Sequence, residues 1–320
     1  MRESVPIPGC FTAGDKAGDA SSAAAVTKSG QCVFISTYRT KLAGQCRLIT
    51  ITWFKDLLLH GLSVAVQGPV SDTQYTCKIQ LKPWTFWKKH GVKNFTVDHK
   101  LVSVAWDLRG AKFRGETEPQ ANYYVALICD SDVVLLLGDL KTTAFKKTGC
   151  RPALIDPILV SRKEHVFGRK RFSTKAKFRE NGAVHEISIE CFNADKSDPD
   201  PNPNPNPTMA IRIDGERLVV VKHLQWKFRG NESVFVDGMR IEIFWDAHDW
   251  LFGSGPRNAV FVIRPGSSPE SSPVVSSTLG SFLMSTEADD GGDGTVSDMG
   301  TGLGNGSVRF SLFLYAWKID

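Results

Sequence analysis

The sequence predicts a mainly β protein, built of antiparallel strands in two duplicated halves, each a β-sandwich or barrel-like unit, with one short helix between them. Three observations predict this: apolar and polar residues alternate with a period of two, helix signals are scarce, and strand patterns recur in the same order. A chain of 320 residues with 42% hydrophobic residues, including 19 Phe and 8 Trp, is also large enough to fill a sizeable core.

The recurring strands define the two halves. Residues 48–53, LITITW, alternate apolar side chains with threonines, and residues 185–191, HEISIEC, alternate apolar with polar residues, as half-buried strands do. The matched stretches are 48–53 with 185–191, 62–66 with 209–213, 103–110 with 223–230, and 124–130 with 240–246. Their separation of roughly 115 to 150 residues is that of a domain rather than of a solenoid repeat, so we predict a tandem duplication.

The third matched pair shares the motif Trp-x-x-Arg-Gly, which we interpret as structural. Trp106 and Trp226 are predicted to fill the cores of their respective halves, because each occupies the inward position of an alternating stretch. Arg109 and Arg229 are placed at strand ends, where the following glycine permits a turn. Each arginine is expected to pair with an acid of its own half.

One helix and one closing strand complete the predicted elements. Residues 139–149, DLKTTAFKKTG, predict a short helix with Asp139 as N-cap, lysines in the last turn and Gly149 as the stop. Residues 308–320 alternate again and predict a strand that returns to lie beside an earlier edge strand.

Composition divides the chain further. Residues 1–30 and 266–307 are rich in small and polar residues and are expected to be disordered, while 197–208 alternates Pro with Asn or Asp and predicts a loop. The first β half is then 31–150 and the second 151–320. The insert at 266–307 has a formal charge of −6, which leaves +11 on the rest of a chain whose total is +5.

Four stretches carry a resemblance to a known family. QCRLITITWFKD (45–56), RKEHVFGRKRFSTKAKF (162–178), HEISIEC (185–191) and FLYAWKID (313–320) resemble the plant family catalogued as domain of unknown function 868. The resemblance runs from about Cys32 to the end of the chain. It implies an intracellular plant protein, and it implies no catalytic residue, because the family has no established activity.

The most basic stretch is 162–179. Its cations are Arg162, Lys163, Arg169, Lys170, Arg171, Lys175, Lys177 and Arg179. Strand alternation from position 171 onward predicts a cationic face over an apolar one. Such a face suits phosphates of nucleic acid or of anionic lipid. The alternative interpretation is a solvated outer strand whose lysines protect an edge against aggregation.

A second mixed stretch is KPWTFWKKHG. Trp84, Trp87, Lys88 and Lys89 combine large aromatic rings with ammonium groups, a combination that can stack on bases or lie at a membrane interface. The alternative is a hairpin whose aromatic residues point inward while its lysines stay in water.

Acidic residues end two of the matched strands. Asp130 with Asp132, and Asp246 with His248 and Asp249, are candidates for acid–base or metal chemistry, and Asp130 and Asp246 are also the candidate partners of the two arginines. Because acids are common in turns and the same turn occurs twice, a structural role explains both copies. The sequence contains no further catalytic template, and we predict no catalytic residue, metal site or cofactor.

Three function classes stay open. The first is a non-enzymatic binding module for a small apolar ligand, a lipid or a protein partner. The second is a phosphate-directed surface protein that binds nucleic acid or anionic membrane through 162–179, and the third is a hydrolase that uses the strand-end acids. No apolar run is long enough for a membrane span, and the seven scattered cysteines are expected to be reduced, so a cytosolic or nuclear location is expected.

Overall fold

The computed structural model describes residues 32–55, 60–68, 74–81, 89–114, 116–168, 171–179, 182–193, 207–254, 257–266 and 309–318. These residues form a mainly β, sandwich-like structure of several antiparallel sheets without a closed barrel, as the sequence predicts. The expectation for 1–30, and most of those for 266–307 and 197–208, fall outside the described residues, but Pro207 and Thr208 belong to a strand rather than to the predicted loop.

The first half contains nine strands in chain order. The strands β1 (Cys32–Leu42), β2 (Gln45–Lys55), β3 (His60–Gln67) and β4 (Gln74–Leu81) form one layer. The opposite five-stranded sheet contains β5 (His90–Val97), β6 (Lys100–Asp107), β7 (Tyr124–Cys129), β8 (Asp132–Gly138) and β9 (Arg151–Pro152). Side chains from the two layers form one apolar core, with Trp53 fully buried in it.

The second half repeats this arrangement of layers. The four-stranded sheet contains β11 (Arg171–Ala176), β12 (His185–Asn193), β13 (Pro207–Ile213) and β14 (Glu216–Val221). The opposite layer contains β15 (Arg229–Val236), β16 (Met239–Asp246), β17 (Asn258–Pro265), β18 (Ser311–Trp317) and β10 (Ile158–Phe167). A second apolar core lies between these layers, with Phe261 fully buried.

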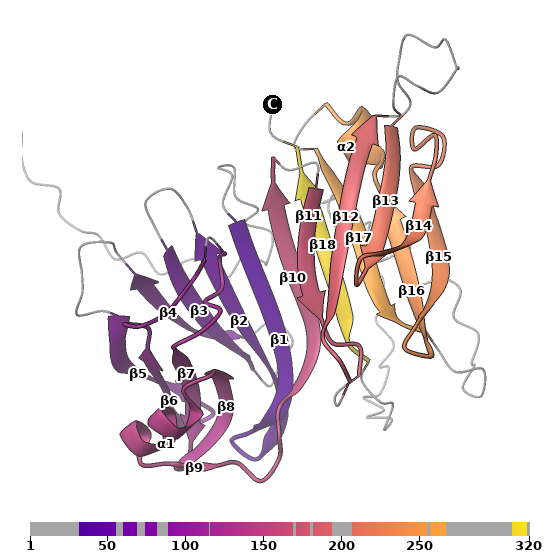
Figure 1. The fold of residues 1–320 in the computed structure, drawn as a ribbon. Helices are drawn as coiled ribbons and strands as arrows, with labels where there is room; N and C mark the ends of the chain where they lie inside the picture. Colours follow the sequence, from indigo (N-terminus) through magenta and orange to yellow (C-terminus); the bar gives the residue numbers. More distant parts are fainter. Residues whose placement is uncertain are drawn as a thin grey trace, which may run out of the picture.

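One long sheet joins the halves. Its order is β15-β16-β17-β18-β10-β1-β2-β3-β4, because β10 pairs with both β18 and β1. Directly paired residues point to the same face of a sheet, and Phe34, Glu164 and Leu314 are paired in series. Phe34 packs on the first core and Leu314 belongs to the second. Both small sheets therefore cover the same face of the long sheet, as Figure 1 shows.

The first two matched strand pairs have equivalent registers. Ile51 of β2 pairs with Val64 of β3, and Ile189 of β12 pairs with Ile211 of β13. All four side chains are buried. The alternation that the sequence predicts for these strands is confirmed.

In the fourth match both segments are strands, β7 and β16, with the predicted inward residues buried, but the third match was wrong. Residues 224–226 form a turn rather than a strand, and Trp226 is 79% exposed. The tryptophan that corresponds to the buried Trp106 of β6 is Trp245 of β16: each lies directly opposite a glycine of the preceding strand, Gly91 and Gly230. Strand alternation alone misled the assignment, since a turn can place residues at the same spacing.

The helices and the last strand also differ in detail. The predicted helix is α1 (Lys141–Thr148), which ends at Gly149 in the left-handed conformation as expected, but its N-cap is Leu140. The Asp139 carboxylate instead accepts a hydrogen bond from the Tyr123 amide, 3.1 Å away. A second helix, α2 (His248–Phe252), was not predicted. Strand β18 lies between β17 and β10 in the middle of the long sheet, not beside an edge strand.

Candidate functional site

A groove opens at one edge of the second sandwich. It encloses about 450 Å³ between strand β14 and strand β15. Its lining residues are Leu218, Val219, Val220, Val221, Lys227, Arg229, Gly230, Asn231, Glu232 and Trp245. Most of the polar groups come from β15 and the loop before it, and the apolar ones come from β14 and Trp245.

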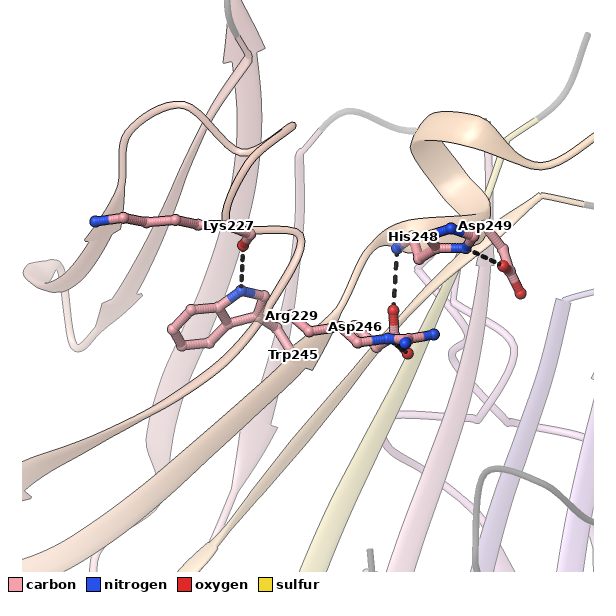
Figure 2. Close-up of polar contacts among 6 residues, drawn as sticks. All are labelled: Lys227, Arg229, Trp245, Asp246, His248 and Asp249. Atoms are coloured by element: carbon pink, nitrogen blue, oxygen red, sulfur yellow. Dashed lines mark hydrogen bonds and ion pairs between the residues drawn. The ribbon is translucent and has the colours of Figure 1, made fainter. Parts of the chain in front are cut away.

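Trp245 forms the inner wall of this groove. Its indole Nε1 donates to the Lys227 carbonyl oxygen at 3.0 Å, which fixes the ring and satisfies its only polar group (Figure 2). A Cβ added to Gly230 would lie 2.3 Å from Trp245 Cζ2. The ring therefore occupies space that any other residue at position 230 would need.

The strand-end acid Asp246 is engaged by its neighbours. Arg229 Nε donates to Asp246 Oδ2 at 2.8 Å, and the His248 amide donates to Asp246 Oδ1 at 3.0 Å (Figure 2). The His248 ring is engaged by a different carboxylate: its Nδ1 lies 2.9 Å from Asp249 Oδ1. The arrangement holds the start of α2 against the end of β16, which is a structural use of the carboxylate.

Asp107 in the first half also accepts from a backbone amide and a guanidinium, but both belong to Arg109. Its Oδ1 accepts from the Arg109 amide at 3.1 Å and its Oδ2 from Arg109 Nη2 at 2.6 Å. The Arg109 side chain holds the pKa of Asp107 below its usual value. The expected Arg229–Asp246 pair is thus found, whereas Arg109 pairs with Asp107 and not with Asp130.

The other pair of candidate acids lies at an exposed turn. Asp130 pairs with Lys100 at 2.5 Å, and Asp132 pairs with Arg151 Nε at 2.6 Å. The structure does not bring these carboxylates to Asp246, which belongs to the other sandwich. In the described part of the chain, no group of three His, Cys, Asp or Glu side chains is arranged to hold a metal.

The basic stretch is divided between an interior and an exterior part. Arg162 lies on the core side of β10, where its Nε donates to Glu164 at 2.8 Å and its Cζ lies 3.9 Å from the centroid of Phe34. Lys163 points to the opposite face, with Nζ 5.5 Å from the centroid of Phe313. The guanidinium of Arg162, one of the predicted surface cations, is thus held by internal partners.

Strand β11 carries the exterior part and confirms the predicted alternation. Arg171, Ser173 and Lys175 are exposed, as are Lys177 and Arg179 just after the strand, while the alternate residues Phe172, Thr174, Ala176 and Phe178 are buried. Arg171 is paired directly with Glu190 of β12, and Lys175 with Glu186. These acids offset part of the positive charge of the strand. Arg169 and Lys170 lie outside the described residues.

The aromatic-basic hairpin is described only in part. Trp84, Trp87 and Lys88 lie outside the described residues. Lys89 is described, and its carbonyl oxygen accepts from the Leu108 amide at 2.6 Å. In the second half the Ala247 amide donates in the same way to the Phe228 carbonyl oxygen, at 2.8 Å.

A buried polar cluster between the sandwiches was missed by the sequence analysis. Arg162 Nη2 lies 3.8 Å from Glu118, and Thr174 Oγ1 donates to the buried Glu164 at 2.5 Å. Burial raises the pKa of Glu118, although Arg162 opposes this effect. Burial also raises the pKa of the nearby Tyr38 phenol to about 12. Glu118 is in a loop far from β10 in sequence, so no local pattern indicated the contact.

A second missed feature is the face of the long sheet that points away from both cores, here called the uncovered face. Two cross-strand rows form its centre: Phe54, Val33, His165, Tyr315 and Val260, and Thr52, Ile35, Lys163, Phe313, Val262 and Phe244. All these side chains are half-buried, and no described sheet or helix covers them. The sequence did carry a signal for this face: the aromatic residues Phe313, Tyr315 and Trp317 alternate with the core residues Leu314 and Ala316.

Four rings on this face form a continuous stack. His165 lies between Tyr315 and Trp317, with ring centroids 4.6 and 6.0 Å away, and Phe167 stacks on Trp317 at 5.7 Å. Trp317 Nε1 donates to His165 Nδ1 at 3.1 Å. Burial, followed by the charge of Lys163, lowers the pKa of His165 to about 4, so this imidazole is neutral near pH 7.

The described helices include none that is long and apolar enough to cross a membrane. Neither a search of curated proteins nor a search of solved structures gave a significant match. A family model described as "Plant protein of unknown function (DUF868)" matches residues 29–318. This range includes every described strand and both sandwiches, and the chain therefore belongs to this plant protein family.

Proposed function

We propose that the protein is a non-enzymatic β-rich binding module that binds a protein partner through the uncovered face. The observation that carries the proposal is the placement of both small sheets on one side of the long sheet. The opposite side keeps two rows of mainly aromatic and aliphatic side chains, interrupted by Thr52 and Lys163, without a covering layer among the described residues. Contiguous apolar surface of this kind is typical of interaction sites.

The size of the uncovered face fits this use. Nine strands about 4.8 Å apart, with outward side chains along about 20 Å of strand, give a face of roughly 800 to 900 Å². A stable protein interface buries about 800 Å² on each partner.

The described cavities favour a protein partner over a small apolar ligand. The two cores are filled by side chains such as Trp53 and Phe261, which have no exposed surface. The groove beside Trp245 is open, and its polar lining does not resemble an enclosed lipid cavity.

We also propose that the two halves arose by duplication. Equivalent registers in β2–β3 and β12–β13, and the equivalent positions of Trp106 and Trp245 opposite glycines, support this. The cysteines of the described residues are free thiols, which supports the further proposal of a cytosolic or nuclear location.

Site-specific photo-crosslinking in plant cells tests the binding proposal. Benzoylphenylalanine at position 262 lies on the uncovered face, and at position 173 it lies on the solvent side of the four-stranded sheet as a control. We expect a discrete protein adduct from position 262 and none from position 173. Absence of an adduct at 262, or the same adducts at both positions, would refute the proposal. An adduct of twice 35.3 kDa would identify the partner as a second copy of the chain.

A further inference from the structure

Two strands with free edges form the walls of the groove in the second sandwich. Strand β14 is the last strand of the four-stranded sheet, and β15 is the first strand of the long sheet. Four consecutive residues of each strand, 218–221 and 229–232, line the groove. Backbone N–H and C=O groups along a free edge have no ladder partner, and an added strand satisfies them.

The corresponding edges of the first sandwich are bridged. Lys93 of β5 donates from Nζ to the Lys78 carbonyl oxygen of β4 at 3.1 Å. Lys93 stands two residues after Gly91, and Glu232 stands two residues after Gly230 in the equivalent strand β15. A carboxylate cannot donate to a carbonyl oxygen. The replacement of an ammonium by a carboxylate therefore leaves the second groove without this bridge.

The groove has an apolar inner wall and charged ends. Trp245 and Val219 provide apolar surface, and the indole N–H is already bonded to the Lys227 carbonyl oxygen. Lys227 lies at one end of the groove and Glu232 toward the other. The Arg229 side chain points to the opposite face of β15, where it pairs with Asp246. The groove thus presents a positive charge at Lys227 and a negative charge at Glu232.

We infer that this groove binds an extended peptide segment of a partner protein as an added β-strand. About four residues of the segment pair with the free edge of β15. An apolar side chain of the segment contacts Trp245. An acidic residue of the segment lies beside Lys227, and a basic residue toward its other end lies beside Glu232. This site is separate from the partner interface proposed for the uncovered face, and it does not depend on that proposal.

Selection from a phage-displayed library of seven-residue peptides against the full chain tests the inference. We expect enrichment of peptides with an acidic and a basic residue on either side of an apolar one. The selected peptides, labelled with fluorescein, are titrated by fluorescence anisotropy. Glu232→Lys reverses the charge and restores a donor like Lys93, and it should weaken binding at least tenfold. Glu216→Lys makes the same charge change on β14 outside the groove lining and should leave binding unchanged.

A proline pair tests backbone pairing. In an antiparallel ladder the N–H groups of adjacent residues point to opposite edges. Only one of Asn231→Pro and Glu232→Pro therefore removes a bond to β16, and the variant that keeps its melting temperature has lost the groove-side N–H. That variant should also lose binding. No enrichment, or equal binding to wild type, Glu232→Lys and the stable proline variant, would overturn the inference.

Discussion

Arg47 and His185 occupy equivalent positions in the two sandwiches. Each is a buried polar residue that stands two positions before a core isoleucine, Ile49 or Ile187. The Arg47 guanidinium bonds the carboxylate of Asp98, in the turn between β5 and β6 of the opposite sheet. His185 Nε2 lies 3.6 Å from Asp237, in the turn between β15 and β16.

The two contacts differ in how much each basic residue depends on its aspartate. Arg47 also donates to the Gln67 carbonyl oxygen at 2.7 Å, but Asp98 is its only carboxylate partner among the described residues. His185 Nδ1 donates to a second carboxylate, Asp214, at 2.7 Å. Hydrogen bonding by His185 lowers the pKa of Asp214. Each sandwich is thus closed at this end by a polar contact between its two layers.

We expect Asp98→Ala to destabilise the protein by about 3 to 5 kcal/mol, because it leaves the buried Arg47 charge unpaired. Asp237→Ala should cost less, about 1 kcal/mol, since His185 keeps its bond to Asp214. Urea unfolding of the two variants measures the difference. Equal losses of stability would contradict the assignment.

The tryptophans give a second prediction. Trp245→Ala should cost about 3 to 5 kcal/mol because it empties the core beside β15, whereas Trp226→Ala should change stability by no more than about 0.5 kcal/mol. Thermal and chemical unfolding of both variants measure these effects. If only Trp226→Ala caused a large loss of stability, Trp226 rather than Trp245 would be the core residue.

Close packing against glycine gives a third prediction. A Cβ at position 230 would lie 2.3 Å from Trp245 Cζ2, and a Cβ at position 91 would lie 3.1 Å from Trp106 Cζ2. Gly230→Ala must displace an indole ring and should cost about 1 to 3 kcal/mol. Gly91→Ala needs a shift of only a few tenths of an ångström and should cost less. Differential scanning calorimetry that ranks the two variants in the opposite order would disprove this explanation.

The His165 stack predicts a pH dependence of stability. The unfolded imidazole titrates near pH 6.5, and the folded one near pH 4, because burial and then Lys163 disfavour its charged form. The unfolded chain therefore binds this proton first as the pH falls. This contribution of His165 to the unfolding free energy is complete above about pH 6.5 and is lost as the pH falls toward 4, by a total of about 3 kcal/mol.

His165→Phe removes this titration while keeping a ring in the stack. The difference in unfolding free energy between wild type and the variant should therefore change between pH 6.5 and pH 4 in the direction of relative stabilisation of the variant. The raised pKa of Glu118 acts in the opposite direction, but it is common to both proteins and cancels in the difference. A difference that does not vary with pH would contradict the prediction.

The basic strand gives a fifth prediction. Because Glu186 and Glu190 oppose two of its cations and Arg162 has internal partners, we expect duplex DNA to bind no more tightly than about 10 µM at 150 mM salt. Fluorescence anisotropy against salt concentration measures this. Tight binding that falls steeply with salt and is lost in Lys177→Glu/Arg179→Glu would instead support a phosphate-directed function.

Local alternation was sufficient to predict much of the fold. The inward residues of β2, β3, β12 and β13, the exposed cations of β11, and the stop of α1 at Gly149 follow from side-chain spacing and from the backbone freedom of glycine. These features depend on neighbours in the chain. The sequence therefore determined a mainly β protein with repeated strand patterns.

Tertiary structure decided which strands are neighbours and which side chains meet. Alternation does not distinguish a strand from a turn of similar spacing, so Trp226 was assigned to the core in place of Trp245. Alternation also does not indicate which face of a strand is covered by a second layer when, as in β18, both faces are apolar. The contacts of Arg162 with Glu118, and of Arg47 with Asp98, join segments more than 40 residues apart. Long-range pairing of this kind depends on sheet order, which local side-chain preference leaves open.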